Sequence, residues 1–145
     1  MVDEPSKETP TLPITPGVVL AEWLGGAVAS LTLAYLSLWM VLVVDMPPQV
    51  PPETRALALR LAEGAYVVGA PGGIALAAYL LQRPGSLGWS LAGSVAGGLC
   101  AWLLGAPQRL TLSQPIAALP FALLTLALAL VGYNAPRLKG IWSRE

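Results

Sequence analysis

The side chains that could carry out chemistry are few, and acids are the main candidates. The chain contains no histidine, and the acids that border its apolar segments include Glu22, Asp45, Glu53 and Glu63. Without histidine the sequence lacks the usual axial ligand of haem, the commonest ligand of zinc and the side chain that most often transfers protons near neutral pH. Enzymatic activity would therefore need paired carboxylates, or a nucleophile beside another base.

The spacing of these acids argues against a catalytic pair. Glu22 and Glu63 each stand at the end of an apolar segment, and in a chain that crosses a membrane four times they fall on opposite faces. Cys100 is the only cysteine, so no disulfide can form within the chain, and its apolar surroundings favour simple packing. We therefore expect no enzyme, no catalytic residue, no cofactor and no bound metal. The catalytic alternative is an enzyme that acts on lipid.

Charged residues divide the chain into apolar segments of membrane length. Hydrophobic residues make up 55% of the chain and charged residues only 11%, against about 25% in soluble proteins. Each charge-free run approaches or exceeds the roughly 20 residues that cross a bilayer, and the runs are 23–44, 64–82, 84–108 and 110–136. These runs are apolar on all sides, unlike a soluble helix. The sequence predicts an all-α integral membrane four-helix bundle with up-down topology and spans at 17–44, 60–82, 87–106 and 115–134.

Two polar tails flank this transmembrane domain of residues 17–136. Residues 1–16 are rich in proline, and Pro10, Pro13 and Pro16 recur every third residue, which is the period of a polyproline II helix. Such a segment is either a stiff spacer or a face that docks into an aromatic groove. Residues 137–145 form a basic tail.

Small residues recur every fourth position in the segment from Arg60 to Gly105, which folds at Arg83-Pro84-Gly85-Ser86. On a helix this spacing aligns them into a smooth stripe against which another helix backbone can pack closely. We therefore expect a glycine-rich central hairpin. Its predicted helix-packing residues are Ala65, Gly69, Gly73 and Ala77 on the second span, and Gly93, Gly97, Ala101 and Gly105 on the third.

Pro71 lies near the middle of the second predicted span. A proline at this position leaves the carbonyl of Val67 without its usual helical donor and predicts a kink. One interpretation is a kink that lets two helices pack closely. The other is a broken helix that lines a transport pathway, as in many secondary transporters.

Aromatic residues lie near the ends of the predicted spans, about 20 Å apart along each helix. Tryptophan and tyrosine prefer the boundary between lipid and water, so we interpret them as interface anchors that match a lipid bilayer. The predicted anchors are Trp23, Trp39, Tyr66, Tyr79, Trp89, Trp102 and Tyr133.

Basic residues set the expected orientation. The side that carries both termini holds five of them and the other side three, so the positive-inside rule places the termini in the cytoplasm. The net charge is zero and no basic patch is present, so nucleic acid is not an expected partner. The preference for arginine over lysine, with abundant alanine, glycine and proline, indicates a GC-rich bacterial genome. We therefore expect the chain in the bacterial cytoplasmic (inner) membrane.

These features favour a non-catalytic accessory or scaffolding subunit of a larger bacterial membrane assembly. Its expected partners are the lipid bilayer and other membrane protein subunits, or further copies of itself in a homo-oligomer. The alternative is a small oligomeric membrane transporter or channel with a broken helix centred on Pro71.

Overall fold

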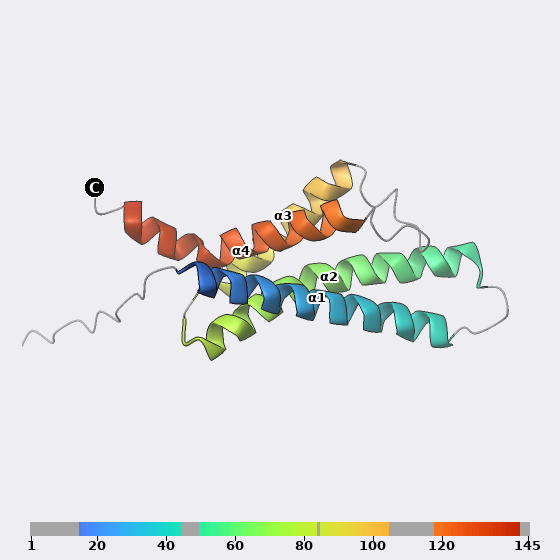
Figure 1. Cartoon of the computed structure of the whole chain (residues 1–145). Helices are drawn as coiled ribbons and strands as arrows, with labels where there is room; N and C mark the ends of the chain where they lie inside the picture. The colour runs from blue at the N-terminus through green and yellow to red at the C-terminus, as the bar shows by residue number, and fades with distance from the viewer. Residues whose placement is uncertain (1–14, 45–49, 84, 105–117, 143–145) are drawn as a thin grey trace, which may run out of the picture.

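The chain is all-helical where the structure describes it. The structure is a computed structural model, and it describes residues 15–44, 50–83, 85–104 and 118–142. Within these ranges it has four helices and no strand, which confirms the predicted all-α class (Figure 1). The helices are α1 (Pro16–Val44), α2 (Pro52–Leu80), α3 (Leu87–Leu103) and α4 (Leu119–Trp142).

Three of the four helices are long and apolar enough to cross a membrane. The candidate spans are Pro16–Val41 in α1, Pro52–Leu80 in α2 and Leu119–Arg137 in α4. The third helix, α3, has 17 residues. At 1.5 Å per residue it is about 25 Å long, a few ångströms less than a typical hydrocarbon core.

The boundaries of α4 differ from the predicted span 115–134. The helix begins at Leu119, and it runs through Pro136 to Trp142 instead of ending at Asn134-Ala135-Pro136. Proline removes one backbone hydrogen bond, but the turn that follows is held from outside the helix. Arg137 contacts Glu22 of α1 and lies over the ring of Tyr133, and these contacts keep the chain helical past the proline.

The helices form two closely packed pairs, α1 with α2 and α3 with α4, which we call the first and second hairpins (Figure 1). In the first hairpin Gly25 lies against Gly73 and Ala77, whereas Ser30 lies against Gly69. Residue numbers rise along one helix as they fall along its neighbour, so the pair is antiparallel. The second hairpin is antiparallel too.

The small-residue stripe of α2 therefore packs against α1 and that of α3 against α4, whereas the expected central hairpin would have packed them against each other. A Cβ atom on Gly73 would overlap the carbonyl of Gly25 in α1, and one on Gly97 would lie 2.6 Å from the Leu124 carbonyl oxygen in α4. The α2 and α3 helices follow each other in the chain, but they share far fewer contacts. The close approaches are thus α2 to α1 and α3 to α4, and not α2 to α3.

Side chains, not backbone, fill the space between the hairpins. One cluster joins Ala70, Ile74 and Ala78 of α2 to Leu126, Ala129 and Tyr133 of α4. A second cluster holds Tyr66, Ala101 and Phe121, with the two aromatic rings 6.0 Å apart.

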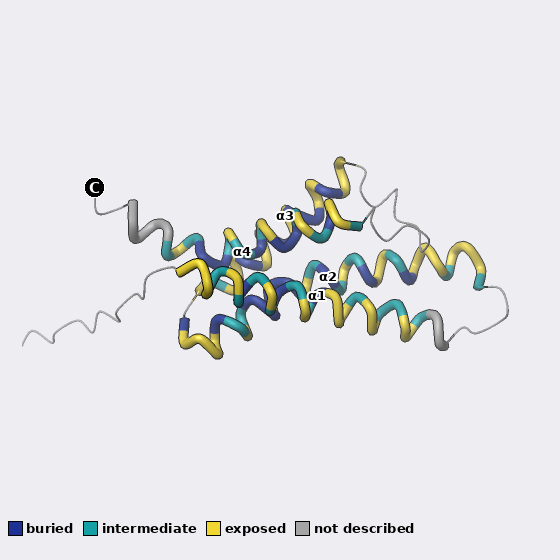
Figure 2. Tube along the Cα trace, in the orientation of Figure 1, coloured by how far each residue is buried: buried dark blue, intermediate teal, exposed yellow. Residues whose placement is uncertain are grey.

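The outer surface is apolar as well. Exposed positions occur along every helix (Figure 2), and many of them carry leucine, valine or tryptophan. The buried positions are mostly small: among the described residues, six of the eleven buried hydrophobic ones are alanine. A soluble domain would place its large apolar side chains inside.

Candidate functional site

A polar cluster joins α1 to α4 at the end of the bundle where α1 begins. It consists of Glu22, Asn134 and Arg137, and Glu22 is completely buried. The Nη1 atom of Arg137 lies 3.2 Å from one carboxylate oxygen of Glu22. The Nδ2 atom of Asn134 donates a hydrogen bond of 3.0 Å to the other oxygen. Each oxygen of the buried acid therefore has its own donor.

The two α4 residues of the cluster also support each other. Arg137 donates a 2.6 Å hydrogen bond to the side-chain oxygen of Asn134, and Asn134 donates to the carbonyl of Leu130. The Arg137 side chain is 14% exposed, and its guanidinium carbon lies 5.6 Å from the centre of the Tyr133 ring. A buried acid is costly unless it is paired and hydrogen-bonded, and both conditions hold for Glu22.

Tyr133 connects the polar cluster to the turn between α2 and α3. Its hydroxyl donates to the carbonyl of Arg83, and its own carbonyl accepts a 3.2 Å hydrogen bond from the backbone N–H of Ser86. Its ring also fills the space beside Gly85, where a Cβ atom would overlap it. Glycine at position 85 therefore allows the turn to lie directly on α4.

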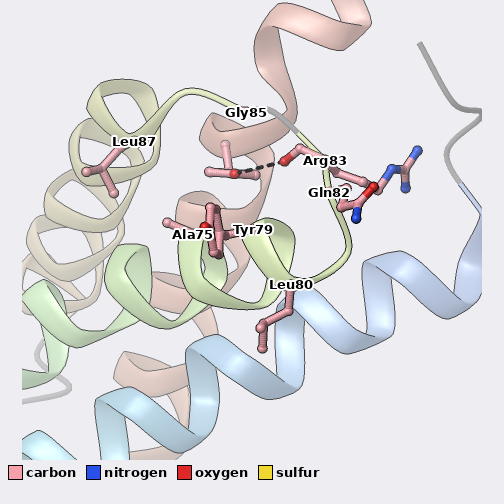
Figure 3. Close-up of a pocket in the computed structure, with 8 residues that line it drawn as sticks. Ala75, Tyr79, Leu80, Gln82, Arg83, Gly85 and Leu87 are labelled. Carbon is pink, nitrogen blue, oxygen red and sulfur yellow. Dashed lines mark hydrogen bonds between the residues drawn. The ribbon is translucent and has the colours of Figure 1, made fainter. Parts of the chain in front are cut away.

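A groove of about 730 Å³ opens beside Tyr133, between the end of α2, the turn and the start of α3 (Figure 3). Most of its wall is apolar or aromatic, and Arg83 is its one charged lining residue. Figure 3 shows the Arg83 side chain leaving the turn on the side away from Leu87. The lining residues are Ala75, Tyr79, Leu80, Gln82, Arg83, Gly85, Leu87 and Tyr133.

The geometry of the polar cluster suits helix attachment better than catalysis. Glu22 is wholly covered, and both of its oxygens are engaged within the protein. Among the described residues, no three His, Cys, Asp or Glu side chains group together as a metal site would require. Cys100 is exposed on α3.

Sequence reasoning did not predict the polar cluster. It treated Glu22 as an acid at a span end and Asn134 as the end of a span, although Asn134 and Arg137 stand three residues apart on one helix face. The predicted membrane topology is the sequence feature that could have revealed the cluster. With both termini on one side of a membrane, the start of the first span and the end of the last lie at the same level, so an acid in one can meet a base in the other.

The predicted stripe residues lie at or near helix contacts. Gly69, Gly73, Gly97 and Ala101 are buried, while Ala65, Ala77 and Gly93 are half-buried. Gly105 lies outside the described residues. A Cβ atom on Gly93 would overlap the carbonyl of Leu128. The stripes are therefore surfaces of close backbone approach within each hairpin.

The predicted interface anchors divide into two groups. Trp39, Tyr79, Trp89 and Trp102 are exposed, and Trp23 is half-buried. Tyr66 and Tyr133 are instead buried inside the bundle. The hydroxyl of Tyr66 donates to the carbonyl of Ala122 in α4, just as that of Tyr133 donates to the carbonyl of Arg83. These two tyrosines join the hairpins, because their hydroxyls find acceptors inside the protein.

Pro71 is buried, and α2 remains helical on both sides of it. The carbonyl of Val67, which a proline at position 71 deprives of its helical donor, accepts a 2.6 Å hydrogen bond from the Ser94 hydroxyl of α3. Serine side chains are known to satisfy carbonyls freed by proline in transmembrane helices. The break in hydrogen bonding at Pro71 thus serves as an attachment point between the two hairpins.

Comparison of the chain with protein families, curated proteins and solved structures finds no match.

Proposed function

We propose that the chain is an integral membrane protein with four spans in up-down order. The distribution of side-chain size and polarity supports this. The exterior carries large apolar side chains, while small residues and paired polar groups lie inside. In lipid, helices associate through close packing and hydrogen bonds, since burying apolar surface brings little advantage there. The shorter α3 would be accommodated by local thinning of the bilayer.

We propose further that the protein is a non-catalytic accessory or scaffolding subunit of a larger bacterial membrane assembly. The observation that carries this proposal is the state of Glu22, the fully buried acid, whose two oxygens are both engaged by α4. A catalytic or transporting acid must reach substrate or water. This one holds two hairpins together, which is the requirement for a rigid docking surface.

Purification from the native membrane in mild detergent tests the proposal. A scaffolding subunit should co-purify with other membrane proteins in fixed stoichiometry, or with further copies of itself. Arg137→Met should loosen the hairpins and lower the yield of these partners, whereas Arg60→Met at the exposed Arg60–Glu63 pair should leave it unchanged. A protein that purifies alone as a monomer from gentle extraction would refute the scaffold.

The proposed location is the bacterial cytoplasmic (inner) membrane, with both termini in the cytoplasm. Single cysteines at Ser6, Gln49 and Ser143, all outside the described residues, can report this in a Cys100→Ala background. A membrane-impermeant thiol reagent added to intact cells should label the cysteine at position 49 alone. Labelling at position 6 or 143 without labelling at 49 would invert the topology.

A small oligomeric transporter or channel is the second candidate, and the observation that favours it is the position of an acid, Glu22, within a candidate span. Ionisable residues inside a span commonly mark ion or proton pathways, and Glu22 is buried six residues after the start of α1. Glu22→Gln separates the two functions. A transporter should lose proton or cation flux in proteoliposomes while its stability holds. A scaffold should lose stability and partners together, because the charge pairing with Arg137 is gone.

A further inference from the structure

The groove beside Tyr133 is a candidate binding site whose occupant can be argued from the sequence. Its volume of about 730 Å³ falls within the usual range for ligand sites of about 300–1,000 Å³. Two tyrosines, Tyr79 and Tyr133, line it, together with Leu80 and Leu87, although Tyr133 is only 4% exposed. Tyr79 is 78% exposed, so its ring is available to a partner. Aromatic-lined grooves of this kind recognise proline-rich segments in the polyproline II conformation.

We propose that this groove binds the chain's own proline-rich N-terminal segment, residues 1–14. The segment lies outside the described residues, and its Pro10 and Pro13, followed by Pro16 at the start of α1, have the period of a polyproline II helix. A polyproline II helix is pre-formed, so docking it costs little conformational entropy. The groove therefore receives a ligand that the same chain supplies.

The position of the segment satisfies the geometric requirement. Residue 15 begins the described chain and α1 begins at Pro16, six residues before Glu22. Glu22 contacts Arg137, whose guanidinium lies over Tyr133, and Tyr133 lines the groove. The segment thus emerges at the groove's end of the bundle. At about 3.1 Å per residue, 14 residues in the polyproline II conformation extend about 43 Å, which is ample reach.

Charge favours the same occupant. Residues 1–14 contain three acidic side chains and one lysine, a net charge of −2. Among the described residues, the one charged residue that lines the groove is Arg83, which is only 6% exposed. Opposite charges steer association, so the basic Arg83 favours the approach of the acidic segment without a direct ion pair.

The proposal goes beyond the scaffold function and does not depend on it. Docking of residues 1–14 would cover Tyr79 and the turn between α2 and α3. The same face would become available to another protein's proline-rich segment only after the chain's own segment leaves. The groove is then a self-occupied recognition surface for proline-rich sequences.

Disulfide trapping in the full-length protein tests the proposal in a Cys100→Ala background. Thr11→Cys is combined with Leu87→Cys at the groove, or with Leu103→Cys at the opposite end of the same helix as a control. A disulfide forms only when the two Cα atoms approach to within about 7 Å. Mild oxidation should give an intrachain bridge for the pair with position 87 and none for the pair with position 103.

Variants of the two partners sharpen the test. Tyr79→Ala should lower the bridging yield by about three- to tenfold, the value of one lost aromatic contact. Tyr35→Ala is the matched control, because Tyr35 is 66% exposed on α1 and does not line the groove. Replacing Pro10 and Pro13 by alanine should lower the yield in the same way.

Four results would overturn the proposal. One is equal bridging at positions 87 and 103, and another is bridging that is insensitive to Tyr79→Ala. The third is a product of twice the chain mass, which would assign the groove to a second copy. A lipid that co-purifies with the protein and is lost in Tyr79→Ala, with no bridging at position 87, would likewise give the groove to lipid instead of the N-terminal segment.

Discussion

The contacts within each hairpin differ in kind from the contacts between the hairpins. Within a hairpin, glycine brings one backbone against another, as at Gly73 against Gly25 and Gly97 against Leu124. Between the hairpins, side chains make the connection through apolar clusters, through the hydroxyls of Ser94 and Tyr66, and through the Glu22 ion pair. The difference separates two tasks. Glycine stripes set how closely two helices approach, whereas the polar groups select which hairpin surfaces meet.

The two kinds of contact should respond oppositely to mutation. Adding volume should damage the interior of a hairpin, because no flexible side chain can yield there. Removing a polar atom should damage the junction between hairpins, because the partner atom is then left buried without a hydrogen bond. Each effect given below is the change in the free energy of unfolding of a variant, measured in detergent.

The largest effect is expected from Gly97→Leu in the second hairpin. Its Cβ atom would lie 2.6 Å from the Leu124 carbonyl oxygen and 2.7 Å from the Thr125 Cα, so the two helices must separate. We expect a loss of at least about 3 kcal/mol, the upper end of the usual cost of overpacking.

Gly88→Leu is the matched control. Gly88 lies on the same helix as Gly97, but a Cβ atom there would meet nothing within 4 Å. Leu99→Ala is a second control, because Leu99 is 58% exposed. Both controls should stay within about 0.5 kcal/mol of wild type. Equal losses for Gly97→Leu and Gly88→Leu would show that α3 and α4 do not pack through this stripe.

An effect of comparable size concerns the two ion pairs of the described chain. Arg137→Met removes the partner of a completely buried acid and should cost about 3–5 kcal/mol. Arg60→Met removes a partner that is 56% exposed and should cost no more than about 1 kcal/mol.

A double-mutant cycle completes the comparison of the ion pairs. Glu22→Leu combined with Arg137→Met should cost much less than the sum of the two single changes, because the double variant leaves no unpaired buried charge. Additive costs would mean that Glu22 and Arg137 do not depend on each other, and the junction would then rest on apolar packing alone.

A smaller effect should come from the serine hydroxyls. Ser94→Ala leaves the Val67 carbonyl with neither a helical donor nor a hydroxyl donor and should cost about 1–3 kcal/mol. Ser90→Ala should cost less, about 1 kcal/mol, because its acceptor is the Ala129 carbonyl inside an uninterrupted stretch of α4. In a Pro71→Ala background the cost of Ser94→Ala should fall, since the restored N–H of residue 71 can bond Val67. An unchanged cost in that background would disconnect Ser94 from the proline.

The all-helical class could be predicted from the sequence. Charge-free runs locate α1, α2 and α4, and small residues four apart identify faces of close approach at positions such as Gly69 and Gly97. The freed carbonyl of Val67 also followed from Pro71 alone. The spacing of small residues identifies the smooth face of a helix, because that face is formed by residues of one helix alone.

The pairing of the helices could not be read in the same way. Adjacency in the chain suggested that α2 packs on α3, but a smooth stripe accepts any backbone of suitable shape, and the outer helices supply it. The sequence likewise predicts Tyr133 as an anchor at the boundary between lipid and water. It lies inside the bundle because the turn at Gly85 leaves room for its ring and Arg83 offers an acceptor. Both outcomes depend on residues far apart in sequence.

The central claim is that helix backbones approach each other closely within each hairpin. Two neighbouring glycines of α2 allow a test, because substitution by alanine adds one methyl group at each position. A Cβ atom on Gly73 would overlap the Gly25 carbonyl and lie 2.6 Å from the Ala29 methyl, whereas one on Gly72 meets nothing within 4 Å. Both substitutions by alanine raise helix propensity equally, by about 1 kcal/mol. The measurement is the free energy of unfolding of Gly73→Ala against Gly72→Ala. The account predicts that Gly72→Ala is neutral or stabilising and that Gly73→Ala is destabilising by about 1–3 kcal/mol. Equal stabilities for the two variants would contradict it.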